Sequence, residues 1–291
     1  MAVDTFIPEV WAADLFVALR GVQIFGQGGL INRDYEGDIA QSGDTVHIGS
    51  LTRPTISNYV KNSTVIDPQT LATTDQALVI DQSKYFAFEV DDVDARQVKD
   101  SGQLLNKAAD DAAFGLADGA DLFLASLMTA GAGSVLTPGA ATTPDAAYKI
   151  VLALKVKLDK AKIPTQGRFL AVAPEFHALL LQDNRFLDAA AYGSNTPILN
   201  GEVGRVLGFQ VMVTLNLPAG TAGTLPAVSN FVVAGHSMAT TFAEQINKVE
   251  AYRPQNSFSD AIKGLYLYGA KVVRPEALAV MDVDVTTGLP A

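Results

Sequence analysis

The stretch NYVKNSTVIDPQTLATTDQALVID, residues 58–81, decides how the rest of the chain is interpreted. It contains strand-forming residues but few large apolar side chains, and Pro68 interrupts it near its middle. The flanking stretches GDTVHIGSL (residues 43–51) and KYFAFEV (residues 84–90) alternate with the period of two that is typical of strands. We therefore expect residues 43–90 to form one hairpin. Arms of about 20 residues would reach ~60 Å, so the hairpin should protrude, with little of its own chain to bury its outer half.

A long helix is expected after the hairpin, over residues 91–130. Asp91, Asp92 and Asp94 would lie at its start, where carboxylates offset the positive end of the helix dipole. Its apolar residues recur at spacings of three and four and form one stripe: Leu105, Ala109, Ala112, Leu116, Ala120, Phe123 and Leu127.

Three glycines interrupt this predicted helix, at Gly102, Gly115 and Gly119. Each weakens a helix by roughly 1 kcal/mol relative to Ala, so we expect another element to pack very close to the helix backbone at these positions. They are also candidate bend points. The Gly- and Pro-containing sequence TAGAGSVLTPGAATT, residues 129–143, is expected to be a linker.

The sequence from residue 143 onward predicts a compact unit, followed by β-strands near the C-terminus. Thr143 is a suitable N-cap and Pro144 a suitable first residue for a helix. A buried strand (RFLAVA, residues 168–173), a helix beginning at Pro174 and further strands follow, an order that predicts an α/β or α+β unit over residues 143–243. The segments NKVEAYRP, GLYLYGAKVVRP and ALAVMDVDV predict β structure near the C-terminus. A short helix is expected near the N-terminus, from Pro8 to Gly21.

The composition indicates a folded protein and excludes several classes. The chain has 291 residues, of which 48% are hydrophobic and 18% charged, and it contains no Cys, so disulfides and thiolate metal sites are excluded. Its net charge of −10 disfavours binding of nucleic acid by the surface as a whole. The N-terminus lacks the basic region of a signal peptide, and no uninterrupted apolar run reaches ~20 residues, so no membrane partner is expected.

No arrangement of residues in the sequence predicts a catalytic, cofactor or metal site. His47, His177 and His236 do not have metal-ligand spacing, and Ser237 beside His236 lacks the G-x-S-x-G motif of hydrolases. Four carboxylates on the long helix could gather a metal, although a solvated helix face is the favoured interpretation: Asp110, Asp111, Asp118 and Asp121. A run of basic residues likewise favours a solvated face over an ion-pairing surface between subunits: Lys149, Lys155, Lys157, Lys160 and Lys162. The protein is therefore not expected to be an enzyme.

The order of these elements resembles the major capsid proteins of tailed phages, which have the Hong Kong 97-type fold. Five segments carry the resemblance across nearly the whole chain: FIPEVWAADLFVALR, GDTVHIGSL, LAVAPEFHALLLQDNRF, GEVGRVLGFQVMVTLNLP and SFSDAIKGLYLYGAKVVRPEALAV. The resemblance implies an α+β fold with an N-terminal arm (1–35), an extended β-hairpin loop (36–90), a peripheral domain with a long spine helix (91–142 and 244–285), an axial α/β domain (143–243) and a C-terminal tail (286–291).

The function that this resemblance implies is a coat protein that self-assembles as hexamers and pentamers into an icosahedral shell around double-stranded DNA. The implied location is the virion capsid, after assembly in the host cytoplasm. The implied partners are other copies of the chain, a separate scaffolding protein, a portal protein, decoration proteins, and packaged DNA that is enclosed without sequence-specific binding. Some family members link subunits through Lys and Asn side chains, but nothing in this sequence identifies a partner for Lys61, and cross-linking is not carried over.

The extended loop supplies the predicted subunit contacts. The residues proposed for them are Arg53, Ile56, Tyr59, Val60, Lys61, Val65, Ile66 and Leu71. Three alternatives remain beside the phage shell: an encapsulin-like cellular compartment of the same fold, an α+β enzyme of unrecognised type, and a monomeric surface-binding module.

Overall fold

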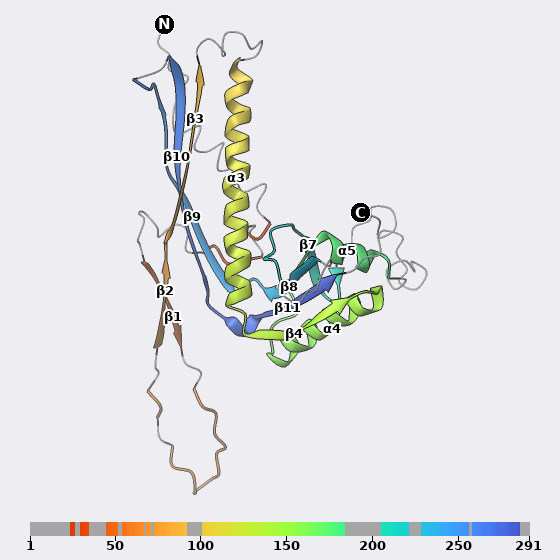
Figure 1. The fold of residues 1–291 in the computed structure, drawn as a ribbon. Coiled ribbons are helices and arrows are strands. Elements are labelled where there is room, and N and C mark those ends of the chain that lie inside the picture. Colours follow the sequence, from red (N-terminus) through yellow and green to blue (C-terminus); the bar gives the residue numbers. More distant parts are fainter. Residues whose placement is uncertain are drawn as a thin grey trace.

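The computed structural model describes most of the chain as an elongated molecule (Figure 1). A long helix stands beside a tall, narrow sheet, a compact unit of helices and strands lies near one end of that sheet, and a two-stranded arm extends beyond it. The described residues are 24–26, 30–34, 45–51, 54–66, 68–70, 73–91, 101–183, 205–220, 228–255 and 258–285. The predicted N-terminal helix lies outside these residues.

The tall sheet has three antiparallel strands in the order β3-β10-β9. They are β3 (Gln82–Asp91), β10 (Ser259–Val272) and β9 (Thr240–Tyr252). The segment KYFAFEV forms most of β3 and pairs with β10, with Phe88 opposite Ile262. The prediction that KYFAFEV is the second strand of the protruding hairpin is therefore wrong.

The hairpin consists instead of β1 (Thr45–Leu51) and β2 (Thr73–Val79), which are antiparallel. Its base is attached to the tall sheet by a small core of Ile48, Leu78, Ile80, Ala243 and Leu267. The Nζ of Lys271 also donates a hydrogen bond to the carbonyl oxygen of Ala77, at 2.8 Å. The described residues between positions 54 and 70, which we call the outer loop, extend away from this base without forming a strand (Figure 1).

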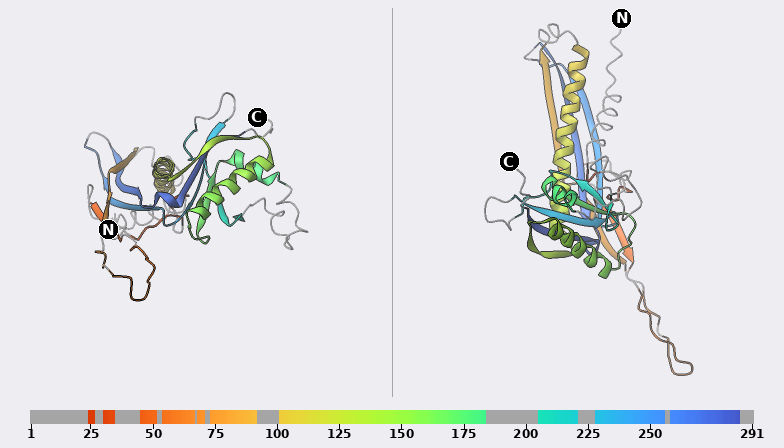
Figure 2. Two further views of the ribbon diagram at one scale, coloured as in Figure 1. Left: turned by 90° about the horizontal axis from the view of Figure 1, so that it is seen from below. Right: turned by 90° about the vertical axis from the view of Figure 1, so that its right-hand side faces the viewer.

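The long helix α3 spans Ser101–Ala130 and runs beside the tall sheet in both views of Figure 2. Asp91 ends β3 rather than beginning this helix, and Asp92 and Asp94 lie outside the described residues. The buried stripe is Ala113, Leu116, Ala117, Ala120, Asp121, Leu124, Ala125 and Met128. Leu116 and Ala120 were predicted for this stripe, whereas Ala112, Phe123 and Leu127 are only partly buried. The true stripe lies beside the predicted one because α3 packs on β10, β3 and also β8.

One helix within the described residues has the length and composition of a membrane span, over Asp111–Ala130 with a mean hydropathy of 1.2. The sequence search for an uninterrupted apolar run did not identify it. Leu116, Leu124 and Met128 on this segment belong to the main hydrophobic core, whereas Phe114 and Leu122 are exposed.

The compact unit contains a six-stranded sheet in the order β4-β11-β8-β5-β7-β6. Its strands are β4 (Ser134–Ala141), β11 (Leu278–Val285), β8 (Val228–His236), β5 (Arg168–Val172), β7 (Phe209–Val213) and β6 (Arg205–Val206). β4 is parallel to β11 and β5 is parallel to β7, while the other pairs are antiparallel. The predicted linker at residues 129–143 is wrong for this part, because β4 lies within it.

Two helices, α4 (Pro144–Lys160) and α5 (Pro174–Leu181), complete this unit. The Oγ1 of Thr143 accepts a hydrogen bond from the amide of Ala146 at 3.2 Å, which confirms the predicted N-cap. The core face of α4 is buried as its spacing predicts at Ala147, Ile150, Val151, Leu154 and Leu158, whereas Ala161, which the spacing also predicts for this face, is only partly buried at the C-cap. Every residue of β5 is buried, which confirms the buried strand predicted from the sequence RFLAVA.

Candidate subunit-contact surfaces

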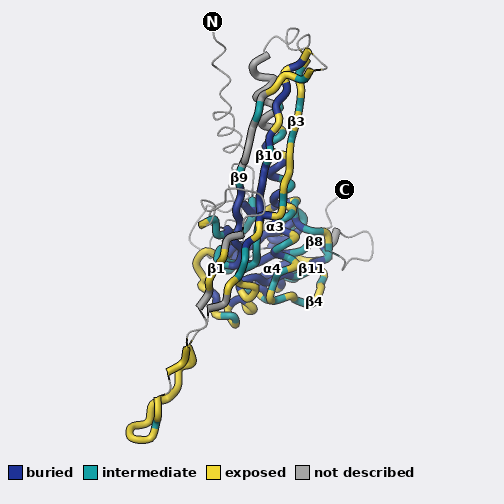
Figure 3. Tube along the Cα trace, turned by 90° about the vertical axis from the view of Figure 1, so that its left-hand side faces the viewer, coloured by how far each residue is buried: buried dark blue, intermediate teal, exposed yellow. Residues whose placement is uncertain are grey.

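The outer loop is almost wholly exposed (Figure 3), and its exposed residues include large apolar ones. The exposed fraction is 93% for Ile56 and 91% for Val65. Tyr59, Val60, Lys61 and Ile66 are also exposed. The predicted contact residues Arg53 and Leu71 lie outside the described residues. Several adjacent apolar residues with no cover are a feature of surfaces that bind another protein.

The tip of the outer loop is a tight turn with its own hydrogen bonds. The amides of Ser63 and Thr64 donate to the carbonyl oxygen of Val60, and the Oγ1 of Thr64 accepts from the amide of Val60 at 2.8 Å. Asn62 has a φ of 64°, a conformation that Asn tolerates better than most residues. Local bonds therefore shape the tip, while the apolar side chains near it remain available.

The glycines on α3 border an open hollow rather than a close contact. A Cβ added at Gly115 or Gly119 would meet nothing within 4 Å, so the expectation of an element packed tightly on the helix backbone there is wrong. The hollow between α3 and β3 has a volume of about 360 Å³, and its lining includes Tyr85, Phe86, Gly115 and Gly119. Gly102 lies in the first turn of α3, and its burial is not described, so the expectation for it stays a prediction.

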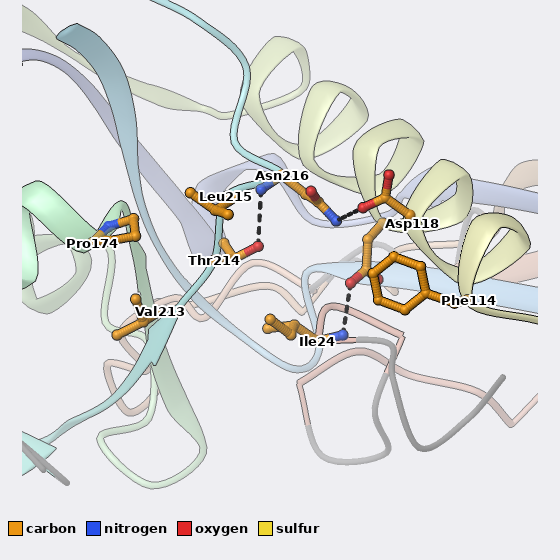
Figure 4. Close-up of a pocket in the computed structure, with 9 residues that line it drawn as sticks. Ile24, Phe114, Asp118, Pro174, Val213, Thr214, Leu215 and Asn216 are labelled. Carbon is orange, nitrogen blue, oxygen red and sulfur yellow. Dashed lines mark hydrogen bonds between the residues drawn. The ribbon is translucent and has the colours of Figure 1, made fainter. Parts of the chain in front are cut away.

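A second hollow, which we call the junction pocket, lies where α3 meets the compact unit (Figure 4). Its volume is about 280 Å³. It is lined by Ile24, Phe114, Asp118, Asp121, Pro174, Val213, Thr214, Leu215 and Asn216. These residues come from the N-terminal segment, α3, the start of α5 and the end of β7, so the pocket touches both parts of the molecule.

Both carboxylates of the junction pocket have partners. The Oδ1 of Asp118 accepts a hydrogen bond from the Nδ2 of Asn216 at 2.7 Å. The Oδ2 of Asp121 accepts one from the amide of Ile24 at 2.7 Å, and its Oδ1 accepts one from the amide of Gly26 at 3.3 Å. Burial raises the pKa of Asp121 from 3.8 to about 6, because the backbone hydrogen bonds offset only part of the desolvation. Asp121 therefore fixes the chain at residues 24–26 to the middle of α3.

Sequence reasoning placed Asp121 on a solvated helix face, and this is wrong, since only 2% of the residue is exposed. A signal for its burial was present. Asp121 follows Ala117 by four positions and precedes Leu124 by three, so it shares their face of the helix. Its partners could not be inferred, because they lie near position 24.

A buried ion pair attaches residues 30–34 to the tall sheet. The carboxylate of Glu244 pairs with the guanidinium of Arg33 and accepts a hydrogen bond from the hydroxyl of Tyr266. Asn32 forms a parallel bridge with Thr241, and the Arg33 guanidinium lies over the ring of Phe242 at 5.3 Å. Glu244 is not among the residues expected from the sequence to be functional, although it shares a face of β9 with Phe242.

Among the described residues, no group of three or more His, Asp and Glu side chains could hold a metal ion.

The three histidines and the basic residues of α4 have separate surroundings. The Nδ1 of His47 lies 2.6 Å from the Oδ2 of Asp75 on the exposed hairpin. Burial lowers the pKa values of His177 and His236. Lys149 forms an exposed ion pair with Asp145 on the same helix.

Comparisons with known proteins agree with this geometry. The family model described as "Phage capsid protein" matches residues 75–281. A solved structure from Mycobacterium phage Che8 is 31% identical, with a TM-score of 0.73, over 89% of this chain and 90% of that one. The mature capsid of bacteriophage PhiM1 is 17% identical, with a TM-score of 0.64, over 89% of this chain and 88% of that one.

A virus-like particle from Pyrococcus furiosus shares the fold at 11% identity, with a TM-score of 0.57, over 94% of this chain and 98% of that one. No curated protein matches the sequence.

Proposed function

This chain belongs to the phage capsid protein family and is a major capsid protein, and from that premise we propose how its copies build a shell. Copies join as hexamers and pentamers into an icosahedral shell that encloses double-stranded DNA. The observation that carries this proposal is the outer loop, whose apolar residues are exposed at the end of an arm anchored to the subunit's own core. A neighbouring copy supplies the surface that covers Ile56, Tyr59, Val60, Val65 and Ile66.

The physical chemistry of this contact suits an assembly that must correct errors. At ~25 cal/mol per Å², burying several hundred Å² contributes a few kcal/mol before the ordering of the loop is subtracted. Each contact is therefore weak enough to be reversible. The closed shell becomes stable because each copy is held by many such contacts at once.

We also propose a division into functional parts, which differs in detail from the sequence expectation. The N-terminal arm is residues 1–35, and the extended loop ends near residue 80, since β3 belongs to the tall sheet. The peripheral part is β3, α3, β9 and β10. The axial part is the six-stranded sheet with α4 and α5, which takes in β4 and β11 from stretches first assigned to the peripheral domain.

The remaining partners follow from shell function. The net charge of −10 suits an inner surface that lets packaged DNA slide rather than stick. Assembly in the host cytoplasm uses a separate scaffolding protein and a portal protein. The subunit acts as a structural protein without catalytic activity.

The alternative, an encapsulin-like compartment, has weaker support, because the family match is to phage capsid proteins, whereas the virus-like particle from Pyrococcus furiosus shares only its fold with this chain, at 11% identity. Negative-stain microscopy of the purified protein, expressed alone and with its genomic neighbours, tests the proposal. Icosahedral particles or rings of capsomers are expected. A compact monomer under all conditions would contradict the proposal, and empty shells that load a cargo peptide without any portal would favour the compartment.

A further inference from the structure

The helices α3 and α4 each expose large apolar side chains in addition to those that they bury in the core. These residues are Phe114 and Leu122 on α3 and Leu152 and Val156 on α4, with exposed fractions between 40% and 58%. Groups of exposed apolar residues are a feature of surfaces that bind another protein. Both helices therefore present a surface that a partner can cover.

On α3 the exposed apolar residues alternate with carboxylates. Their order is Asp111, Phe114, Asp118 and Leu122, and we call these four residues the acidic face. Spacings of three, four and four place them along one side of the helix. Figure 4 shows Phe114 and Asp118 projecting from α3 at the junction pocket. Asp111 is exposed and Asp118 is partly buried, so the face offers negative charge beside apolar surface.

On α4 the exposed apolar residues lie between lysines. Their order is Lys149, Leu152, Val156 and Lys160, and we call these four residues the basic face. The spacings are again three, four and four, and all four residues are exposed. Residues 144–162 contain five Lys and two Asp, a net charge of +3 in a chain whose total is −10. The basic face is therefore a local exception on an acidic protein.

The composition of the two faces selects another copy of this chain as the partner. Duplex DNA would pair with the lysines, but its surface is dominated by phosphates and would leave Leu152 and Val156 without an apolar partner. The acidic face of a second copy offers both carboxylates and apolar side chains. Opposite charge also favours contact between unlike faces over contact between like ones.

We propose that the acidic face of one copy packs against the basic face of the next copy around each hexamer and pentamer. The apolar residues of the two faces cover one another, and the carboxylates lie near the lysines. Such a contact joins two different surfaces, and contacts of this kind close into rings when the rotation between copies allows it. The proposal rests on the proposed function, because it requires that copies assemble, and it adds a contact separate from that of the outer loop.

Disulfide cross-linking between two single-Cys variants tests the contact, since the chain has no Cys of its own. One full-length chain carries Phe114→Cys or Leu122→Cys, the other carries Leu152→Cys or Val156→Cys, and each pair is assembled together with an added oxidant. A disulfide forms only when the two Cα atoms approach to roughly 4–7 Å. We expect at least one mixed pair to form a covalent dimer about tenfold faster than either variant alone, because the contact raises the local thiol concentration.

The matched control replaces the cysteine on α4 by Val135→Cys, an exposed position on β4 outside both faces. Its mixture with Leu122→Cys should cross-link no faster than the single variants. A chain that carries both Leu122→Cys and Val156→Cys should give a ladder of covalent oligomers that ends at the size of one capsomer. Equal rates for a single variant and its mixture would indicate contact between like faces, and a faster monomer band in the double variant would indicate contact within one chain. Either result would overturn the proposal.

Charge reversal in the cross-linking pair provides a second measurement. Lys160→Glu in the chain with the α4 cysteine should slow the mixed cross-link about threefold or more, because a carboxylate then faces carboxylates. Adding Asp111→Lys to the other chain should restore most of the rate. Lys84→Glu, at an exposed position on β3, is the matched control and should leave the rate unchanged. Equal rates for Lys160→Glu and Lys84→Glu would overturn the pairing of the two faces.

The proposed function and this contact fail in different ways. Wild-type rings or shells without any mixed cross-link above the control would leave the shell in place and overturn this contact alone. Absence of both particles and cross-links would contradict the two proposals together. Retention of a DNA duplex by wild type that Lys160→Glu abolishes, again without cross-links, would assign the basic face to DNA and overturn the contact.

Discussion

The outer loop and the six-stranded sheet show two opposite uses of apolar residues in one chain. In the sheet, Phe169, Leu170 and Val280 are at most 2% exposed. In the outer loop, Ile56 and Val65 are more than 90% exposed. Both regions consist largely of extended backbone, yet only the sheet buries its side chains within the subunit (Figure 3).

This difference shows how the subunit separates stability from assembly. The sheet, covered by α4 and α5, supplies the core that makes a single copy fold. The base of the hairpin is anchored separately, because Leu78 and Ile80 lie in a small core on the tall sheet, and the outer loop extends from that base. The outer loop contributes little to the fold and remains available to a neighbour.

The largest expected effect comes from deletion of residues 55–72. We expect complete loss of shells with almost no change in the free energy of unfolding of the subunit, because the removed residues bury no core. Negative-stain microscopy measures the first quantity and denaturant unfolding the second. If the deletion unfolds the subunit, the outer loop packs within its own chain and the comparison fails.

Phe169→Ala tests the other side of the comparison. Its side chain is buried in β5, and truncating a buried Phe costs about 3–5 kcal/mol. Chemical denaturation of the subunit should therefore show a large loss of stability, whereas the exposed Ile56→Ala should show almost none. Similar losses for the two variants would mean that the outer loop is not free of the subunit core.

Asp121 gives a prediction that depends on pH. Its pKa is about 6 in the folded subunit and 3.8 when unfolded, so the folded state binds more protons between these values. Its contribution to stability is fully present below about pH 4 and is lost as the pH rises through 6. We expect the free energy of unfolding of wild type to gain about 1 kcal/mol between pH 7 and pH 5, relative to Asp121→Asn.

Comparison with Asp121→Asn is necessary because His177 and His236, whose pKa values burial lowers, change stability in the opposite direction over this range. Both histidines are present in each protein, so their contributions cancel. Denaturant unfolding at pH 7, 6 and 5 gives the two curves. Parallel curves would show that Asp121 titrates normally and that its burial imposes no penalty.

Gly115→Ala should have the smallest effect on the subunit. The added Cβ meets nothing within 4 Å, so the helix should gain up to about 1 kcal/mol from its better propensity. If Gly115 is a bend point, shells of this variant should differ in size or shape, as measured by microscopy. Normal particles would remove Gly115 from the candidates.

Gly269→Ala, in strand β10, gives the opposite expectation. Its Cβ would lie 2.4 Å from the carbonyl oxygen of Val79, so this change should destabilise the base of the hairpin. A stable Gly269→Ala subunit would show that the base of the hairpin moves to make room.

The sequence alone determined the elements whose signals are local. Thr143 and Pro144 start α4, the periodic apolar residues of α4 define its buried face, and the apolar run of β5 is buried throughout. The outer loop was also predictable, because a strand-like stretch with few large apolar residues cannot build a core. These signals depend on neighbours within a few positions, which the sequence displays directly.

Only the tertiary structure decided which strands pair and which polar residues are buried. The alternation of KYFAFEV specifies that one face is buried but not that β10 is its partner, and the sequence 134–141 becomes β4 because β11 offers it an edge. Asp121 is buried because the amides of Ile24 and Gly26 reach it from far away in the sequence. A periodic pattern fixes the face of an element, whereas its partner is selected by packing among distant segments.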